Sequence, residues 1–443
     1  MVRHSGLRLN KSLLFIQSIP FVSICRKFSQ THFSRQHKLP LNHLILSIFN
    51  RKGATLAMEL RRFFKSLHPK AADSISTPGY HKQRLKLNPE AFMVLSDFHV
   101  QNFYAEETDL ETFKDHFVLA IDGSYLNLPN TRENMGIYGF QENQAAQQVQ
   151  AGVSCLYDVL NKMILNLTIN DRKFSERGQV EVHLTKIKKF IQDRPYILVL
   201  DRGYPSSFFF LERLRQNQKF VVRLSSSDFR KEQLNMASAD ENVVIEFTQA
   251  RINPYRHTPF AKRLRETGFI KLRFVKIALP DGKMEFLATN LSKDDFSSQD
   301  IGELYHLRWG IETAYDTLKN KFLLENFTGK KAILIEQDIL ATVCLYNMMQ
   351  DMLRDAEIEQ REKNKDKHHK YRMKINVNMA IGIVKDDLIK MALETDPGKR
   401  AEMFEGVIKA IADNIIPVRE NRQFERENKH PAIKHPFSKK HSF

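Results

Sequence analysis

The chain has 443 residues, enough for two or three domains sharing one sizeable hydrophobic interior. Apolar residues make up 42% of the sequence and charged residues 27%, which excludes wholesale disorder and a mostly membrane-embedded protein. The formal charge of +16 favours a polyanionic partner such as nucleic acid, although a merely basic soluble protein remains an alternative.

The first 39 residues are predicted to form a basic, disordered leader. Residues 1–58 contain nine Lys and Arg and no acid, which leaves 59 basic and 52 acidic residues, or +7, for the rest. Such a start resembles an organelle transit peptide, and the apolar run 12–25 resembles a signal peptide. That run is too short to span a bilayer. We therefore favour a dispensable or DNA-contacting leader, with Met58 as an alternative start.

Residues 40–110 are predicted to form a helical DNA-binding region. Apolar and basic residues recur at helical spacing over 41–67, and a Pro-Gly turn precedes a second basic helix within 76–92. The side chains that characterise this second helix are Tyr80, Lys82, Arg84 and Lys86. A solvated basic helix packed on the next domain is an equally good interpretation.

Residues 111–224 show the order of elements of a ribonuclease-H-like fold, which is a mixed five-stranded sheet flanked by helices. Three short apolar strands come first, and two further strands then alternate with helices, which implies parallel crossovers. The expected strands are 117–121, 152–157, 163–169, 196–200 and 220–224, and the expected helices are 176–192 and 205–218. The fold class is therefore α/β, with the first part of a catalytic core over 111–224.

The remaining chain is predicted to complete this core. A β-rich insertion is expected at 225–297, the last, helical part of the core at 298–356, a helical C-terminal region at 357–418 and a flexible basic tail at 419–443. Strands are expected at 243–247, 269–279 and 284–291, helices at 300–320, 331–355 and 376–414, and an exposed loop or helix extension at 357–370.

Two aspartates follow buried strands of the predicted core. Asp122 follows 117–121 and Asp201 follows 196–200, and each alone is as easily a turn or helix-cap residue. In the inferred sheet the first and fourth strands are neighbours, so the two carboxylates come together. Two buried anions require a cation, and oxygen ligands without nearby His or Cys favour Mg²⁺ or Mn²⁺.

A predicted helix supplies the third carboxylate. At about 100° per residue, Tyr305, Arg308, Glu312 and Lys319 fall at about 0°, 300°, 340° and 320°, so they share one stripe. Glu312 can then ligate a metal while Arg308 and Lys319 hold phosphates. A surface ion pair between Arg308 and Glu312, worth about 0.3 kcal/mol, is the simpler alternative.

These segments together resemble bacterial insertion-sequence transposases of the insertion-sequence-four family. The resemblance rests on the Tyr-Arg-Glu-Lys spacing, on Asp122-Gly-Ser and on Asp201-Arg-Gly-Tyr. It extends to Thr289-Asn-Leu before the helix and to Leu304-Tyr-x-x-Arg-Trp309-x-Ile-Glu within it. It covers about residues 40–434, with the extreme N-terminus unmatched.

The resemblance implies a DDE triad of Asp122, Asp201 and Glu312 that binds two Mg²⁺ or Mn²⁺ ions and transfers phosphoryl groups. Element ends would be nicked, and the free 3′-hydroxyls would attack the opposite strand and then the target. The implied partners are double-stranded DNA, namely terminal inverted repeats and target DNA, and a second protomer in a synaptic homodimer. The implied location is the bacterial cytoplasm, in association with the nucleoid and with no membrane.

Six residues are DNA-binding candidates by this resemblance or by charge. Tyr305, Arg308 and Lys319 would hold terminal phosphates, and Trp309 would either stack on a displaced base or pack in the core. Arg202 would line the DNA channel, as would Arg223. Two other functions stay open: another ribonuclease-H-like nuclease, such as a junction resolvase, and a catalytically inactive DNA-binding descendant or transposition inhibitor.

Overall fold

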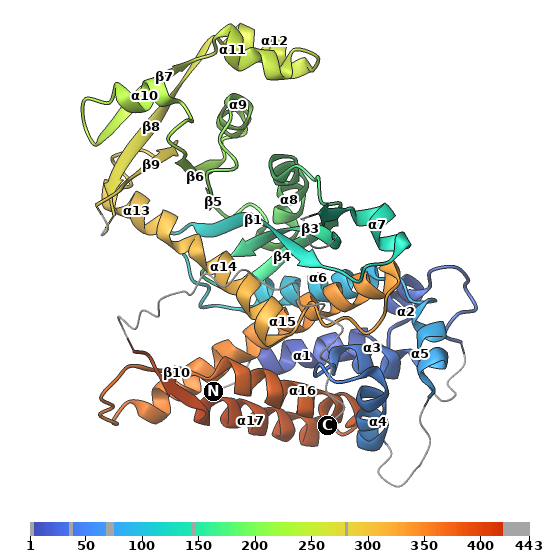
Figure 1. Ribbon diagram of the computed structural model, residues 1–443. Helices are drawn as coiled ribbons and strands as arrows, with labels where there is room; N and C mark the ends of the chain where they lie inside the picture. Colours follow the sequence, from blue (N-terminus) through green and yellow to red (C-terminus); the bar gives the residue numbers. More distant parts are fainter. Residues whose placement is uncertain (1–3, 35–38, 68–74, 143–146, 280–281, 420–443) are drawn as a thin grey trace.

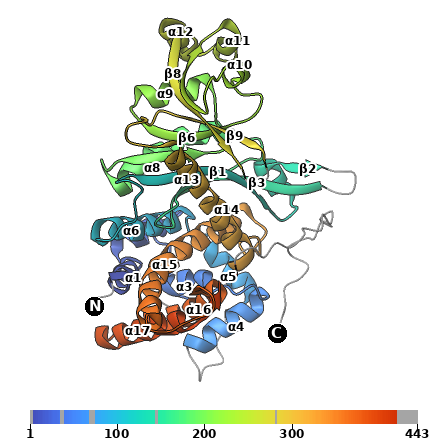
Figure 2. The ribbon, with the colours of Figure 1, turned by 90° about the vertical axis from the view of Figure 1, so that its left-hand side faces the viewer.

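One mixed sheet of nine strands organises the part of the chain that the computed structural model describes, which is residues 4–34, 39–67, 75–142, 147–279 and 282–419. Figure 1 shows a large helical layer against one face of this sheet, and one end of the sheet projecting as part of a smaller lobe. The view turned by 90° shows the same tiers (Figure 2). The chain is thus an α/β protein.

The central five strands have the ribonuclease-H-like arrangement that the sequence predicts. They are β1 (Phe117–Asn127), β3 (Gln147–Asp158), β4 (Met163–Asn170), β5 (Tyr196–Leu200) and β6 (Lys219–Leu224), and their order is β4-β3-β1-β5-β6. The first three pair antiparallel, whereas β5 runs parallel to β1 and β6 parallel to β5. The first and fourth core strands are therefore neighbours, as expected.

Strands β1 and β5 read as continuous apolar runs because both faces of the sheet are covered. Val118 and Ala120 of β1 pack into the core shared with α15 (Ala332–Asn364), whereas Leu119 and Ile121 pack into the core beneath α8 (Glu176–Ile191) and α9 (Ser207–Arg215). Figure 1 shows α8 and α15 on opposite sides of the sheet. Side chains two residues apart in a strand lie on the same face of the sheet. The position of a residue in β1 therefore determines which of the two cores its side chain faces.

The predicted meander of consecutive strands is interrupted. A helix, α7 (Arg132–Tyr138), and a short strand, β2 (Phe140–Glu142), lie between β1 and β3. The side chain of Thr131 accepts a hydrogen bond from the Asn134 backbone N–H and caps this helix. The seven-residue helix was missed because it is too short to show a helical repeat of apolar residues.

The β-rich insertion extends the sheet. Strand β9 pairs antiparallel with β6, then β8 with β9, and β7 with β8. Its elements are α10 (Arg230–Leu234), β7 (Asp240–Glu246), α11 (Gln249–Ile252), η1 (Asn253–Tyr255), α12 (Pro259–Thr267), β8 (Phe269–Ala278) and β9 (Met284–Thr289). Figure 1 shows them as the projecting lobe. The sequence predicted these strands but not their continuity with the core sheet.

The expectation of a disordered leader is wrong for the described residues 4–34. Helices α1 (His4–Phe15) and α2 (Ile19–Cys25) pack into the helical layer, with Leu9, Leu13 and Phe21 in its core. Arg8 is fully buried, and its Nε donates to Asp351 Oδ2 at 2.8 Å. The leader looked unstructured because the acid that neutralises this arginine lies more than 300 residues away in the sequence.

The region 40–110 is helical, but its second basic helix turns partly inward. The elements are α3 (Leu41–Phe49), α4 (Leu56–Leu67), α5 (Thr77–Arg84) and α6 (Glu90–Glu106). Tyr80 and Arg84 of α5 are buried, and Arg84 Nη2 donates to Asp338 Oδ1 at 2.8 Å. Those two residues therefore belong to the core. A DNA-binding role for this region stays a prediction.

The C-terminal half completes the helical layer. The elements are α13 (Ser298–Leu307), α14 (Trp309–Asp316), η2 (Thr317–Lys321), α15, β10 (Met373–Ile375), α16 (Val377–Leu393), α17 (Pro397–Asp413) and β11 (Ile415–Pro417). The helices predicted at 300–320 and 376–414 are each divided, the second by the Asp396 cap and Pro397. Residues 357–364 extend α15. The predicted basic tail lies outside the described residues from 420 onward.

Among the described helices, α15 alone is long and apolar enough to cross a membrane by length and composition. Most of its apolar stretch is buried inside the protein, where Ile335, Ile339 and Val343 are core residues. A core helix passes the same test of length and composition, so α15 is explained by its packing.

The buried histidine of α8 makes folding stability depend on pH. His183 Nε2 lies 2.9 Å from Ser154 Oγ, its Nδ1 lies 3.0 Å from Asn166 Nδ2, and burial lowers its pKa to about 4. The unfolded histidine titrates near pH 6.5, so the unfolded state binds more protons between pH 6.5 and 4. The folded state therefore loses stability as the pH falls through that window.

We predict that this group costs on the order of 2 to 3 kcal/mol of unfolding free energy between pH 7 and 4. Urea unfolding of His183→Gln should show a shallower loss on acidification than the parent protein. Comparing the two proteins cancels the opposite contributions of Asp122 and Asp158, whose folded-state pKa values are raised by burial. Identical acid dependence in both proteins would contradict the assignment.

Candidate active site

Asp122 lies where β1 loses its parallel neighbour. Pairing of β1 with β5 stops at Ile121 opposite Leu200, whereas pairing with β3 continues to Asn127. The prediction that Asp122 ends its strand is therefore wrong, and the residue is accessible because β5 ends beside it. Its side chain remains 21% exposed and accepts the Gly123 N–H at 2.9 Å.

Asp201 follows the last residue of β5 and shares the sheet edge with Asp122. Its Oδ1 accepts the Tyr305 hydroxyl at 2.9 Å and lies 4.0 Å from Arg223 Nη1. The prediction that the two strands bring these aspartates to one point is consistent with the parallel register of β1 and β5.

The two aspartates have opposite pKa shifts. Burial raises the pKa of Asp122 to about 6, helped by the nearby charges of Glu176 and Asp201. Burial also acts on Asp201, but the Arg202 N–H, the Tyr305 hydroxyl and the cations Arg308 and Arg223 outweigh it and lower the pKa of Asp201. One carboxyl is thus held ionised while its neighbour is easier to protonate, a division typical of functional carboxyl pairs.

Glu312 lies on α14 and is paired with Arg308, which in turn reaches Asp122. Arg308 Nη2 donates to Glu312 Oε1 at 2.7 Å, and the Glu312 side chain is 42% exposed. Among the described residues, no three acids, histidines or cysteines are grouped closely enough to hold a metal ion as they stand. In this arrangement Glu312 is therefore held by Arg308 and forms no such group with the aspartates.

Arg308 is the counter-ion at the centre of the site. Its side chain is 3% exposed, and Nη1 lies 3.9 Å from Asp122 Oδ2. Burial alone would lower its pKa, but its interactions with Tyr305, Glu312 and Asp201, including the hydrogen bond to Glu312, outweigh burial, so its pKa is raised. Within the described part of the chain, its Nε and Nη1 have no hydrogen-bond partner. The guanidinium therefore neutralises the acids without fully satisfying its own donors.

Tyr305 and Lys319 also reach the sheet edge, on the same side as Arg308. Tyr305 is buried and orients Asp201, and Lys319 Nζ donates to Ser124 Oγ at 2.7 Å and to the Tyr125 carbonyl at 2.8 Å. Burial lowers the pKa of Lys319. The predicted helix is divided at Arg308 into α13 and α14. Tyr305 nevertheless contacts the residue after β5, and Lys319 contacts β1. Phosphate contacts by these side chains stay a prediction.

Two of the remaining DNA-binding candidates are exposed, and a third is paired with acids. Trp309 is 53% exposed, which is contrary to the core interpretation and leaves its ring free to stack, and the Arg308 guanidinium lies 5.4 Å from that ring. Arg202 is exposed directly after Asp201. Arg223 Nε lies 3.1 Å from Glu285 Oε1, so this arginine is partly engaged within the protein.

Two site residues escaped sequence analysis. Glu176 begins α8, and its charge contributes to the raised pKa of Asp122. Tyr204 is buried near Asp122, Glu176 and Asp201. Burial raises the pKa of Tyr204, and the charges of these three acids add to that effect. Glu176 looks from sequence like an ordinary acid in the first turn of a helix. The one available signal was the glycine that follows each aspartate, at Gly123 and Gly203.

The chemistry of these donors suits a divalent cation. The side chains near the edge offer carboxylate oxygens from Asp122, Asp201 and Glu176, with Glu312 able to join them, and such hard ligands match Mg²⁺ or Mn²⁺. The phenol oxygen of Tyr204 has no described hydrogen-bond partner although it is fully buried beside these acids. An orphaned polar atom and an unsatisfied arginine both indicate that the site is built for a further polar group.

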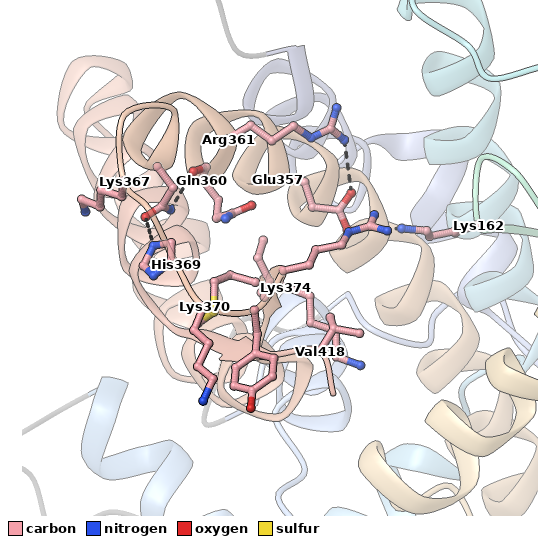
Figure 3. Close-up of a pocket in the computed structure, with 14 residues that line it drawn as sticks. Lys162, Glu357, Gln360, Arg361, Lys367, His369, Lys370, Lys374 and Val418 are labelled. Carbon is pink, nitrogen blue, oxygen red and sulfur yellow. Dashed lines mark hydrogen bonds and ion pairs between the residues drawn. The ribbon is translucent and has the colours of Figure 1, made fainter. Parts of the chain in front are cut away.

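A second feature is a basic hollow of about 770 Å³ at the C-terminal end of α15. Figure 3 shows Lys367 and Lys370 on one side of it and Lys162 on the other. Its cationic lining residues are Lys162, Arg361, Lys367, Lys370, Arg372 and Lys374. Glu357 is the acid in this lining and pairs with Lys162 at 3.2 Å. The sequence predicted only an exposed charged stretch here.

The cationic lining makes this hollow a candidate contact for the phosphate backbone of a nucleic acid. Replacing both Lys370 and Lys374 by Ala should weaken duplex binding and lower the slope of log affinity against log salt concentration by about 1 to 2, since each phosphate contact contributes about 0.9. The control replaces Lys186 and Lys188, exposed residues of α8. Fluorescence anisotropy at several salt concentrations measures both quantities. An unchanged slope would exclude the hollow from the DNA path.

Residues 114–348 match the model of a protein family described as the transposase DDE domain, which covers more than half of the chain. No curated protein matches the chain. Among solved structures, the chain is similar to one described as the cryo-EM structure of the piggyBac transposase synaptic complex with hairpin DNA. The similarity has 10% sequence identity and a TM-score of 0.46, and covers 96% of this chain and 88% of that chain.

Proposed function

The chain belongs to the DDE transposase family, and on that premise we propose that it is a cut-and-paste transposase of the insertion-sequence-four type. The proposed substrates are the terminal inverted repeats of its own element and a target duplex. The observation that carries this proposal is the placement of Asp122 and Asp201 on neighbouring parallel strands, with the Tyr305-Arg308-Glu312-Lys319 segment facing them.

Asp122, Asp201 and Glu312 are the proposed ligands of two catalytic Mg²⁺ or Mn²⁺ ions. Such ions, when bound, activate the attacking oxygen and neutralise charge on the phosphate and the leaving oxygen. Asp201 is held ionised by its neighbours and is thus ready to bind a cation. Asp122 is more easily protonated, so cation binding would favour its charged form.

The residues around the acids have separate proposed roles. The Tyr305 hydroxyl fixes the orientation of Asp201, and Arg308 neutralises the carboxylates until DNA and cations arrive. Arg308 is then free to bind a terminal phosphate, because a cation and a guanidinium would compete for the same acids. Lys319 donates hydrogen bonds to Ser124 and Tyr125 in the second half of β1. It would exchange these contacts for contacts with phosphate oxygens.

Trp309 and Arg202 would contact the DNA next to the cleaved bond. The exposed indole of Trp309 offers a stacking surface for a base displaced from the duplex. Arg202 is exposed beside Asp201, where a cation would meet the DNA backbone. A homodimer that holds two element ends is part of the proposal, since concerted joining at a target requires two active sites.

The test is strand cleavage of a labelled duplex that carries the inverted repeats flanking the gene. The proposal requires cuts at the repeat ends with Mg²⁺, none with EDTA, and none with Asp122→Asn. DNA binding without cleavage under every metal condition would instead identify an inactive descendant or inhibitor. Cleavage of branched junctions in preference to repeat ends would identify another ribonuclease-H-like nuclease.

A further inference from the structure

A fourth carboxylate, Glu176, lies against the backbone segments that carry both aspartates. Its Oε1 is 2.6 Å from the position that a Cβ on Gly123 would occupy, and its Oε2 is 3.2 Å from the corresponding position on Gly203. A real Cβ essentially never approaches another atom to within 2.6 Å, so a side chain at Gly123 would displace the carboxylate. Glycine after Asp122 therefore leaves the space that this acid occupies, and the acid also lies close to the glycine two residues after Asp201.

Glu176 has no compensating partner in the described part of the chain. No cation or hydrogen-bond donor contacts its carboxylate there, and burial together with the charge of Asp201 raises its pKa. An isolated, partly buried carboxylate is unfavourable unless a cation compensates it. The position therefore costs stability in the absence of a cation.

Tyr204 provides an independent observation at the same place. Its side chain is 1% exposed, its Oη has no described hydrogen-bond partner, and it is within electrostatic range of Asp122, Glu176 and Asp201. A buried phenol normally finds a partner. An unpaired donor among three acids, none of which it contacts, indicates that a further polar group belongs between them.

A simpler role for Glu176 is to complement the positive N-terminal end of α8. Asp and Glu are favoured in the first turn of a helix, and Ser175 already caps this helix through the Gly178 N–H at 3.2 Å. That role requires neither contact with Gly123 and Gly203 nor proximity to two other acids. An acid serving the helix alone would gain by facing solvent, where its charge is hydrated.

We propose that Glu176 is a fourth carboxylate of the divalent-cation site, acting together with Asp122 and Asp201. This inference rests on the proposed function, because it concerns the same cations. It differs from the three-carboxylate site implied by the family resemblance, since it adds a ligand from the helix that follows the third core strand. Because no three acids among the described residues are grouped closely enough as they stand, Glu176 and the aspartates would have to draw together around the cation.

The test is Mn²⁺ binding to the full-length protein without DNA, measured by electron paramagnetic resonance and by calorimetry. We expect Glu176→Gln to weaken Mn²⁺ binding at least about 10-fold, within the range for losing a group that supports a metal site. The melting temperature in EDTA should not fall, because the variant removes an uncompensated charge. The matched control is Asp193→Asn, which removes the charge of an exposed acid just after α8.

The outcomes separate this inference from the proposed function. If Asp122→Asn abolishes Mn²⁺ binding while Glu176→Gln binds as the parent does, Glu176 serves only the helix and this inference is overturned. If Glu176→Gln loses Mn²⁺ affinity but keeps its fold by circular dichroism, the fourth ligand is supported. If the parent protein neither binds Mn²⁺ nor cleaves DNA, the proposed function itself fails. Binding by Glu176→Asp at an intermediate affinity would further support a ligand role.

Discussion

Glu312→Gln is expected to retain DNA binding and lose at least about 1,000-fold in cleavage rate. The change preserves the shape of the side chain but removes a charged metal ligand. A bound cation supplies several kcal/mol of transition-state stabilisation, and each 1.4 kcal/mol that is lost lowers the rate about tenfold. The fold should be unaffected, because the bond that is weakened is an i,i+4 pair to Arg308 on a side chain that is 42% exposed. Such exposed pairs contribute little to stability.

The matched control is Glu303→Gln, an exposed acid on α13 that accepts a hydrogen bond from Gln299. Single-turnover cleavage of a pre-nicked repeat end would be compared with duplex affinity measured in Ca²⁺. Wild-type cleavage by Glu312→Gln would remove this residue from the site. Loss of binding together with cleavage would indicate that Glu312 acts through Arg308 and not as a metal ligand.

Arg8→Met is expected to destabilise the protein by about 3 to 5 kcal/mol, the usual cost of breaking a buried ion pair from one side. Arg8 is fully buried, and its guanidinium donates to Asp351 and to Glu107 at 3.2 Å. Its removal leaves Asp351 fully buried, and among the described residues His99 Nε2 at 3.3 Å is then the remaining possible counter-charge. Urea unfolding measures the loss.

Lys11→Met is the control for this prediction, because Lys11 lies on the same helix in an exposed pair with Glu106. It should change the unfolding free energy by less than about 1 kcal/mol. A chain that begins at Met58 lacks α1, α2 and α3 and should not form the same helical layer. Full stability in Arg8→Met, or in the shortened chain, would restore the leader interpretation.

The core sheet could be predicted from sequence because its signals are local. Val118 to Ile121 and Ile197 to Leu200 are unbroken apolar runs, and such runs identify strands that are buried on both faces. The adjacency of the first and fourth strands followed from the order of elements. The three proposed carboxylates each stand in a short motif that is weak by itself, and it was the family resemblance carried by the motifs together that selected them.

The features that sequence analysis missed depend on contacts between distant segments. Arg8 and Asp351 are 343 residues apart, and nothing near Arg8 reveals its partner. Glu176 looks in the sequence like an ordinary acid in the first turn of a helix. Its proximity to Asp122 follows only from the packing of α8 on β1. Extension of β1 beyond Ile121 depends on β3, whose residues 150–155 are its partners there.

The central claim is that Asp122, Asp201 and Glu312 hold divalent cations against a DNA phosphate. The most direct measurement is anomalous scattering from Mn²⁺ in crystals of the protein bound to a pre-cleaved repeat end. The account predicts manganese peaks contacted by all three carboxylates, with Arg308 moved from Glu312 to a phosphate oxygen. Manganese bound elsewhere, or DNA seated at the sheet edge with the Arg308–Glu312 pair intact and no cation between the aspartates, would contradict it.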